Sequence, residues 1–442
     1  MSSVVLLAEH NRPSPLRRLM NTLALPLLLV GAGSAIVVSG AVLGQDYLPM
    51  GMGFRPGEMD FVGSFALWDG KRYEGIAKKG YSYNPDAMSP VQFFPAYPLA
   101  GRFIAAVTGW RVDFSLLLNS YLFLIAAGVA TSLYVNCRTV EPAAAVVPQD
   151  PDLMTRAAAL YPADRDAHQR GDAASFVLLA LAFFPTTFYF RMAYTESFFL
   201  FEVILTLYGI KRRWPCWVLA PIIGLATATR ATGVALIVPF VWYLWHHSPT
   251  WRGFLLRSVI LVPTACWGLT AYVSFQYLAF GDGLAFVRTN KYWDERPPIP
   301  LAEKLWLELT LEPIFCEYDP SCKCHQRHSG RDPSPLFSMY YANPLYFLFF
   351  AGLVAFGAIK GWLTPEEVLT GAALLLLSYF SKGYDACMCS QARYASTVFP
   401  AYLVMGRLLQ RLPVQIVAMI VAICALFLGI YSALFVRWYF VY

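Results

Sequence analysis

Long apolar stretches recur along the whole chain and alternate with polar segments. A backbone inside hydrocarbon must satisfy its own hydrogen bonds, and no alternating strand pattern is seen, so these stretches predict helices. Many approach the length of about 20 residues that crosses a bilayer. We therefore predict an all-α polytopic membrane protein with about eleven transmembrane helices. The stretches lie near 22–43, 113–135, 173–190, 196–210, 215–230, 232–247, 254–280, 344–360, 366–381, 396–410 and 413–436.

Composition supports residence in a membrane. Of the 442 residues, 57% are hydrophobic and only 14% are charged, whereas soluble domains are roughly 45–50% apolar and about 25% charged. The net charge of +6 is not concentrated in any Lys/Arg-rich run. This pattern predicts membrane lipids, and not nucleic acid, as partners.

The distribution of basic residues predicts the orientation of the chain, because cytoplasmic loops carry an excess of Lys and Arg. With the N-terminus inside, the outer side carries loops 44–112, 281–343 and 382–395, and the inner side carries a mixed-charge, poorly ordered loop, 137–172. We expect one membrane domain, 1–442, whose first stretch stays as a helix, although a cleaved signal peptide is an alternative. The inner clusters are Arg12, Arg17 and Arg18; Lys211, Arg212 and Arg213; Arg252 and Arg257; Lys360; and Arg407 and Arg411.

The first outer loop contains a short stripe at helical spacing, formed by positions 65, 69, 72, 73, 76 and 80. The stripe predicts a helix in the membrane interface, with Phe65 and Trp68 pressed into the lipid boundary and Asp69 at the rim. A sugar transferase that inverts its anomeric centre needs one carboxylate as general base. Asp69 fits that role. The alternative is that Asp69 caps the helix or pairs with Lys71 or Arg72.

Three arginines on the predicted outer side break the positive-inside pattern: Arg191, Arg230 and Arg393. Ionisable groups at membrane depth cost free energy unless they are paired, and they often mark functional sites. A phosphate leaving group would suit them, because arginine grips phosphate with a fixed fork of donors. Alternatively, the side chains extend to lipid headgroups, or Arg191 pairs with Glu196. Glu202, deeper in the fourth stretch, is interpreted as a buried structural partner.

Five of the nine cysteines fall in the two later outer loops. An oxidising compartment favours disulfides, which would join loop 281–343 to loop 382–395 and leave at least one thiol out. A zinc site is the alternative, because Cys322, Cys324, His325 and His328 offer sulfur and imidazole ligands in a short span.

In chain order, five segments resemble the PIG-V family, the GPI mannosyltransferase II type of multi-span glycosyltransferase. The segments are Trp68-Asp69 with Tyr73, Ile76-Ala77 and Gly80-Tyr81; Phe93-Phe94-Pro95-Ala96-Tyr97-Pro98; Tyr194-Thr195-Glu196-Ser197-Phe198; Ala228-Thr229-Arg230 with Gly233; and Arg393-Tyr394 before Pro400.

The resemblance implies a GT-C glycosyltransferase: a bundle of many helices with long outer loops and an active site at the outer face. It implies a polyprenyl- or dolichyl-phosphate sugar donor, mannose as the sugar, and Asp69 as the base. We expect neither a cofactor nor a divalent metal. The residues expected to bind donor phosphate or substrate are Arg230, Arg393, Arg191, Arg72, Tyr73, Trp68, Tyr97, Tyr194, Glu196 and Tyr394.

The acceptor stays open between a GPI-like glycolipid and another outer-face molecule. The sequence has no Asn-x-Ser/Thr sequon, which favours a bacterial inner membrane over the ER membrane. Two other functions stay as alternatives: a non-catalytic subunit of a membrane glycosylation complex, which implies a partner subunit, and a lipid or solute transporter. No internal repeat is evident, and this weakens the transporter alternative.

Overall fold

The computed structural model describes residues 15–51, 60–140, 173–329 and 338–439, and within these ranges the chain forms helices and no strands. Each predicted apolar stretch coincides with a helix or a pair of helices. These helices are α2 (Pro15–Tyr47), α5 (Val112–Val140), α7 (Ala173–Phe183) with η4 (Pro185–Arg191), α8 (Glu196–Lys211), α9 (Cys216–Thr229), η5 (Ala231–Leu236) with α10 (Ile237–His246), α11 (Trp251–Ala265) with α12 (Trp267–Phe280), α17 (Met339–Ile359), α18 (Pro365–Lys382), α20 (Phe399–Gln410) and α21 (Val414–Val436).

Four of the described helices are long and apolar enough to cross a membrane, and six spans result if each of two bent pairs is counted as one. The four are α2, α5, α17 and α21. These features support an integral membrane protein. The expected number of about eleven spans stays a prediction, because α8, α9 and α10 are shorter than the length that crosses a bilayer.

Two stretches expected to be single helices are broken. Between α7 and η4 the chain bends by 78°, at Pro185, and between α11 and α12 it bends by 55°, next to Cys266. Proline cannot donate the backbone hydrogen bond that continues a helix, and Pro185 and Pro263 lie at or just before these breaks. The first break carries Arg191 into the interior of the protein.

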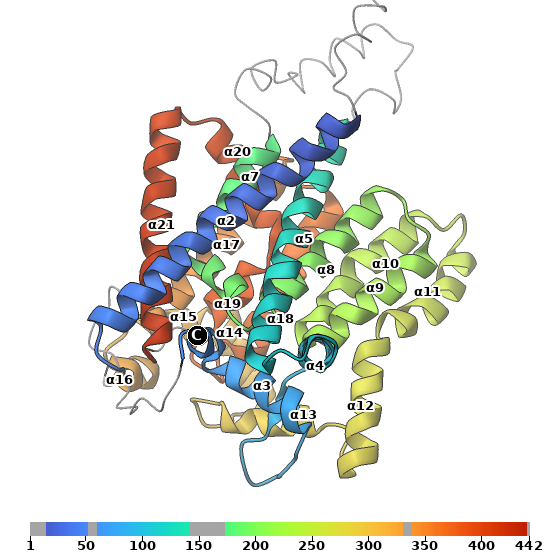
Figure 1. Ribbon diagram of the computed structural model, residues 1–442. Coiled ribbons are helices and arrows are strands. Elements are labelled where there is room, and N and C mark those ends of the chain that lie inside the picture. Colours follow the sequence, from blue (N-terminus) through green and yellow to red (C-terminus); the bar gives the residue numbers. More distant parts are fainter. Residues whose placement is uncertain (1–14, 52–59, 141–172, 330–337, 440–442) are drawn as a thin grey trace, which may run out of the picture.

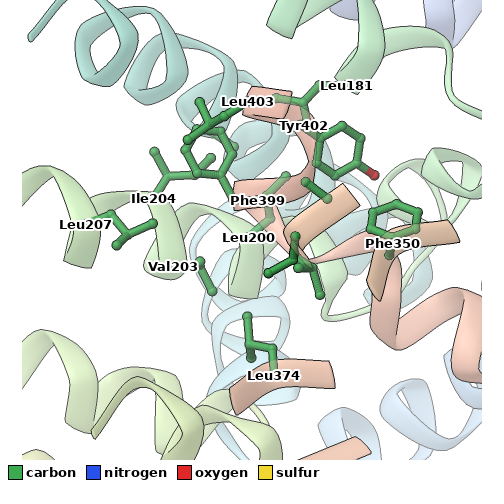
Figure 2. Close-up of a cluster of buried hydrophobic side chains, with 14 of the residues drawn as sticks. Leu181, Leu200, Val203, Ile204, Leu207, Phe350, Leu374, Phe399, Tyr402 and Leu403 are labelled. Carbon is green, nitrogen blue, oxygen red and sulfur yellow. The ribbon is translucent and has the colours of Figure 1, made fainter. Parts of the chain in front are cut away.

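The helices pack around a continuous apolar core. Figure 2 shows part of this core, where α7, α8, α17, α18 and α20 meet. In a membrane the lipid is as apolar as leucine, so close packing of side chains, rather than escape from water, holds such helices together. The labelled residues are Leu181, Leu200, Val203, Ile204, Leu207, Phe350, Leu374, Phe399, Tyr402 and Leu403.

Shorter helices from the predicted outer loops gather at one end of the bundle, where Figure 1 shows α3, α4, α13 and α16. The first loop is more helical than we expected. Pro95 directly precedes α4 and Pro98 lies in its first turn, where proline is tolerated. The short helices are η1 (Val62–Ala66), α3 (Asp69–Lys79), η2 (Pro90–Gln92), α4 (Ala96–Thr108), α13 (Ala285–Arg288), η6 (Thr289–Tyr292), α14 (Leu301–Leu309), α15 (Glu312–Cys316), α16 (Lys323–Ser329) and α19 (Gln391–Ser396).

Two other expectations about the loops need correction or comment. Phe65 does not face lipid: it is 3% exposed and belongs to a buried cluster with Tyr189 and Tyr194. The inner loop expected at 137–172 begins later, because α5 continues to Val140, and residues 141–172 lie outside the described part of the chain.

Two disulfides hold the outer layer together. Cys324 pairs with Cys387, and this bond joins the two later outer loops as expected. Cys316 pairs with Cys322, so Cys389 is the outer cysteine that is not in a disulfide. His328 Nδ1 lies 2.7 Å from a Glu317 carboxylate oxygen. These pairings oppose the zinc alternative, because disulfide sulfurs are not thiolate ligands.

Candidate active site

Asp69 is the first residue of α3, at a point where the backbone is tightly constrained. The preceding residue, Trp68, has φ 54° and ψ −118°, and a positive φ is uncommon for a bulky residue and costs free energy. The Gly70 amide donates to Leu67 O at 2.9 Å, and the Ala193 amide donates to Phe65 O at 2.9 Å. These contacts fix the start of α3 against the turn between η4 and α8.

Four charged side chains form a cluster at this point: Asp69, Glu196, Arg230 and Arg393. Arg393 donates through Nη1 to Asp69 Oδ2 and through Nε to Glu196 Oε1. Arg230 Nη1 also donates to Glu196 Oε1, at 2.6 Å. The four residues come from α3, the start of α8, the end of α9 and α19, so only the tertiary fold brings them together.

The two carboxylates of the charge cluster differ in access. The Asp69 side chain is 20% exposed, whereas that of Glu196 is fully buried beneath its two arginines. Only Asp69 can therefore meet an incoming hydroxyl group. Asp69 does not pair with its neighbours in α3, because Lys71 binds Glu74 at 3.0 Å and Arg72 contacts Met88 Sδ at 3.3 Å.

Aromatic rings surround the charge cluster and limit its movement. The Arg393 guanidinium lies 4.3 Å from the centre of the Tyr194 ring, and Arg230 lies 5.1 Å from that of Tyr394. Tyr73 is buried against Phe93, with ring centres 5.2 Å apart. Burial raises the pKa of the Tyr73 phenol above its ordinary value, so Tyr73 is a neutral hydrogen-bonding group at physiological pH.

Two cavities meet at Asp69. The small cavity has a volume of about 190 Å³ and the large cavity about 580 Å³. Six residues line both cavities, and we call them the junction: Asp69, Gln92, Phe93, Lys382, Arg393 and Tyr394. Molecules bound in the two cavities would therefore both lie next to these side chains.

The cavities have different chemistry. The small cavity is bordered by Arg230, by hydroxyl groups and by apolar rings; its other lining residues are Tyr73, Phe94, Thr229, Ala231, Thr232, Phe286, Asn290 and Ser381. The large cavity is rich in indole and phenol rings and carries two more cations; its other lining residues are Trp68, Lys71, Arg72, Met88, Tyr292, Trp293, Glu295, Ala386, Cys389, Ser390 and Trp438.

Four of the expected binding residues line neither cavity. Glu196 and Tyr194 contact Arg393 of the charge cluster, whereas Arg191 and Tyr97 lie outside the charge cluster. Arg191 is fully buried, and its guanidinium donates to Ser34 Oγ at 3.2 Å and to the carbonyl oxygens of Thr187 and Ala182 at 3.1 Å. It does not pair with Glu196, which is occupied by the two arginines of the charge cluster. Tyr97 donates to Leu116 O at 2.9 Å and supports the ring of Tyr73.

Glu202 has the buried structural position that we expected. It is 1% exposed and accepts a hydrogen bond of 2.8 Å from the Thr229 hydroxyl. This bond links α8 to the last turn of α9, directly before Arg230.

The sequence analysis missed Lys382, the last residue of α18, which lines both cavities. It carries the same signal that identified the outer arginines. Lys382 follows an apolar stretch at its predicted outer end and so breaks the positive-inside pattern. Gln92 and Trp293 were also missed, and the sequence pattern offers no comparable signal for them.

One group of residues in the described part of the chain has metal-ligand spacing. Ligand atoms of Glu312, Cys316 and Cys322 lie within 4.8 Å of one another. The two sulfurs form a disulfide, and Arg296 donates to the Glu312 carboxylate at 2.6 and 2.8 Å. These residues therefore form a structural disulfide and ion pair, and this arrangement suits a metal ion poorly. None of them lines either cavity.

Comparisons with known proteins leave the family open. The sequence matches no known family profile and no curated protein. Among solved structures, the chain is similar to the apo Archaeoglobus fulgidus oligosaccharyltransferase, with 13% identity, a TM-score of 0.43 and coverage of 94% of this chain and 56% of that one. The same enzyme tethered to an acceptor peptide gives 12% identity, a TM-score of 0.40 and coverage of 94% and 55%. At these scores the likeness does not establish a shared family or activity.

Proposed function

We propose that this chain is a membrane glycosyltransferase of the GT-C type that moves a sugar from a lipid phosphate to an acceptor hydroxyl with inversion. Asp69 acts as the general base. The observation that carries the proposal is the accessible carboxylate of Asp69, held by Arg393 at the junction of two cavities. A transferase can use this arrangement, because the acceptor hydroxyl group must contact the base and the anomeric carbon of the donor at the same time.

The small cavity suits the phosphate end of the donor. Arg230 and Thr232 border it, and a guanidinium and a hydroxyl group can both donate to phosphate oxygens. The hydroxyl groups of Thr229 and Ser381 also line this cavity, but they donate to Glu202 and to the Ser378 carbonyl oxygen. Phe94 and Phe286 add apolar surface for the first part of a polyprenyl or dolichyl chain.

The large cavity suits the acceptor. Its volume is about three times that of the small cavity, and aromatic rings such as those of Trp68, Trp293 and Trp438 offer flat apolar faces to a sugar ring. Arg72 lies at this cavity and extends the positive charge toward the acceptor.

The finer assignments rest on the resemblance described above. Mannose is the proposed sugar, and the proposed acceptor is a GPI-like glycolipid or another molecule at the non-cytoplasmic face of a bacterial inner membrane or the ER membrane. Neither a cofactor nor a divalent ion is part of the proposal, because basic side chains that line the small cavity supply positive charge where negative charge develops.

Sugar transfer in membranes tests the proposal directly. The assay supplies labelled polyprenyl-phosphate-mannose and native lipid extract to the wild type, to Asp69→Asn and to Glu74→Gln. Asp69→Asn should lower transfer by about 100-fold or more, because an amide cannot accept the proton. Glu74→Gln, on the same helix but outside both cavities, should keep wild-type activity.

Three outcomes would contradict the proposal in different ways. Equal transfer by wild type and Asp69→Asn would remove Asp69 from the mechanism. Transfer by no folded variant would favour the non-catalytic subunit. Movement of unmodified lipid or sugar across the membrane, without a new glycosidic bond, would favour the transporter.

A further inference from the structure

Lys382 lies where a leaving group would form, and it is also the last residue of a helix. It closes α18, whose register is set at the other end by a capping box between Thr364 and Glu367. A lysine at a helix C-terminus is favoured by the helix dipole. That preference does not explain why this side chain is only 13% exposed and lines both cavities.

The charge cluster is neutral by itself, and Lys382 lies outside it. The two carboxylates of the charge cluster, Asp69 and Glu196, neutralise the two guanidiniums of Arg230 and Arg393. Lys382 is the remaining charged residue that lines the small cavity. The described lining of this cavity therefore carries one positive charge without a partner in the charge cluster.

The contacts of Lys382 leave room for a ligand. Its ammonium group lies 3.4 Å from Asn290 Oδ1 and 3.8 Å from Asp294 Oδ1. Both distances exceed the length of about 2.7–2.9 Å that is typical of charge-assisted hydrogen bonds. An ammonium group has three donors and turns freely on its stem, so Lys382 can bind a phosphate oxygen without giving up a strong existing bond.

The two arginines of the charge cluster are less free than Lys382 to move toward a departing phosphate group. Arg393 uses Nη1 and Nε on Asp69 and Glu196, and Arg230 uses Nη1 on Glu196. If either guanidinium moved toward a departing group, the buried carboxylate of Glu196 would lose a hydrogen-bond donor. Such a loss is costly in a buried site.

We propose that Lys382 binds the phosphate of the lipid-linked donor and stabilises the negative charge that forms as this phosphate leaves. The inference rests on the function proposed above. In the transfer step, the acceptor oxygen forms a bond to the anomeric carbon and its proton passes to the Asp69 carboxylate. The bond between the anomeric carbon and the phosphate oxygen breaks, and its electron pair stays on the phosphate. The phosphodiester with one negative charge thus becomes a phosphate monoester with two, next to Lys382.

Direct binding of the product lipid tests this role without requiring turnover. The protein is placed in phosphatidylcholine nanodiscs and titrated with tritiated undecaprenyl phosphate and with undecaprenol, which has the same chain and no phosphate. Lys382→Met should raise the Kd for undecaprenyl phosphate by about 10- to 100-fold, the range for a lost hydrogen bond to a charged group. Lys382→Arg should bind within about threefold of wild type, because it restores the charge.

Lys78→Met is the matched control, because Lys78 is a lysine of the same outer layer that pairs with Glu74 at 2.6 Å and lines neither cavity. Thermal unfolding of each variant verifies that it is folded. If wild type and Lys382→Met bind undecaprenyl phosphate equally, the role of Lys382 is wrong while the proposed function stands. If wild type binds undecaprenyl phosphate no better than undecaprenol, the lipid-phosphate donor is wrong and the inference falls with it. Weaker binding of undecaprenyl phosphate by Lys382→Met but not by Lys78→Met supports the inference. This result would hold even if the transfer assay failed because it lacked the right sugar or acceptor.

Discussion

At the scale of single residues, Arg393 is the side chain on which the charge cluster depends. It contacts the exposed carboxylate of Asp69 and the buried carboxylate of Glu196 through two different nitrogens. It thereby ties α3 to α8, and it holds the Asp69 carboxylate in one orientation at the junction. A group with one nitrogen cannot make both contacts with the same geometry.

Arg393→Lys therefore tests orientation separately from charge. We expect kcat to fall by about 100-fold, because a small displacement of a catalytic group can cost that much, while the protein still folds. The measurement is sugar transfer with saturating donor. Arg102→Lys, an exposed position on α4, should leave kcat unchanged. Wild-type kcat in Arg393→Lys would show that the positive charge alone is sufficient.

A second prediction concerns Glu308, on α14 in the predicted outer layer. Burial raises the pKa of its carboxyl group from 4.5 to about 7, although Lys304, 3.9 Å away, partly opposes this shift. The folded protein therefore holds this proton more tightly than the unfolded chain does. Linkage then requires the contribution of Glu308 to stability to fall as the pH rises from about 4.5 to about 7.

Glu308→Gln should consequently unfold at a higher temperature than wild type at pH 8, and the difference should shrink at pH 5. Thermal unfolding in detergent at the two pH values measures this. Glu303→Gln, an exposed position on the same helix, should show no such pH dependence. A constant difference between Glu308→Gln and wild type across this range would mean that the Glu308 carboxyl does not titrate there.

At the scale of elements, the segment 383–390 connects α18 to α19 and thus Lys382 to Arg393. Three of its non-glycine residues have positive φ: Cys387 (48°), Met388 (58°) and Ser390 (65°). Such conformations persist only where the surrounding structure holds them. The bond from Cys387 to Cys324 supplies one such restraint, since it anchors this segment to α16.

Replacing Cys324 and Cys387 together by serine should lower both the unfolding temperature and the transfer rate. The chain-entropy relation gives about 4 kcal/mol for this bond, which spans 63 residues. For the bond between Cys316 and Cys322, which spans 6 residues, it gives about 2 kcal/mol.

The matching double serine variant at Cys316 and Cys322 should thus be less destabilised and should keep more activity. Thermal unfolding and transfer assays compare the two variants. The reverse order would show that the short disulfide, rather than the anchor of segment 383–390, supports the site.

At the scale of the whole molecule, the candidate site lies at the end of the bundle where the short helices gather (Figure 1). The basic clusters that predict the cytoplasmic side lie elsewhere; Arg252 and Arg257, for example, lie in the first half of α11, directly after the connection between α10 and α11. If the orientation is right, α3 and this connection face opposite sides of the membrane.

Cysteine labelling in intact cells tests the orientation. Lys78→Cys, on α3, should react with a membrane-impermeant maleimide added outside, whereas Arg252→Cys, on α11, should react only after permeabilisation. Labelling of the wild type gives the background from the native cysteines. The opposite pattern would place the candidate site on the cytoplasmic face, and it would contradict a donor used at the outer face.

Sequence by itself determined the helical character of the chain and singled out charged residues that the structure brings together in the charge cluster. Apolar stretches of this length predict helices because a backbone in lipid has no other way to satisfy its hydrogen bonds. Arg230 and Arg393 stood out for a related reason, since charge next to apolar sequence is costly unless it has a partner or a function. Asp69 stood out as a carboxylate on the stripe of the first outer loop, where a base was expected.

Only the tertiary structure decided which charges meet. Arg191 and Arg230 carry the same sequence signal. The bend at Pro185 nevertheless buries Arg191 among hydroxyl and carbonyl oxygens. Arg230, at the end of α9, instead donates to Glu196 at the start of α8. The junction unites residues as distant as Asp69 and Arg393. Local sequence patterns report the periodicity of each segment and the free-energy cost of placing a charge in it. Which side chains meet across hundreds of residues depends on how the helices pack, and no local pattern encodes that packing.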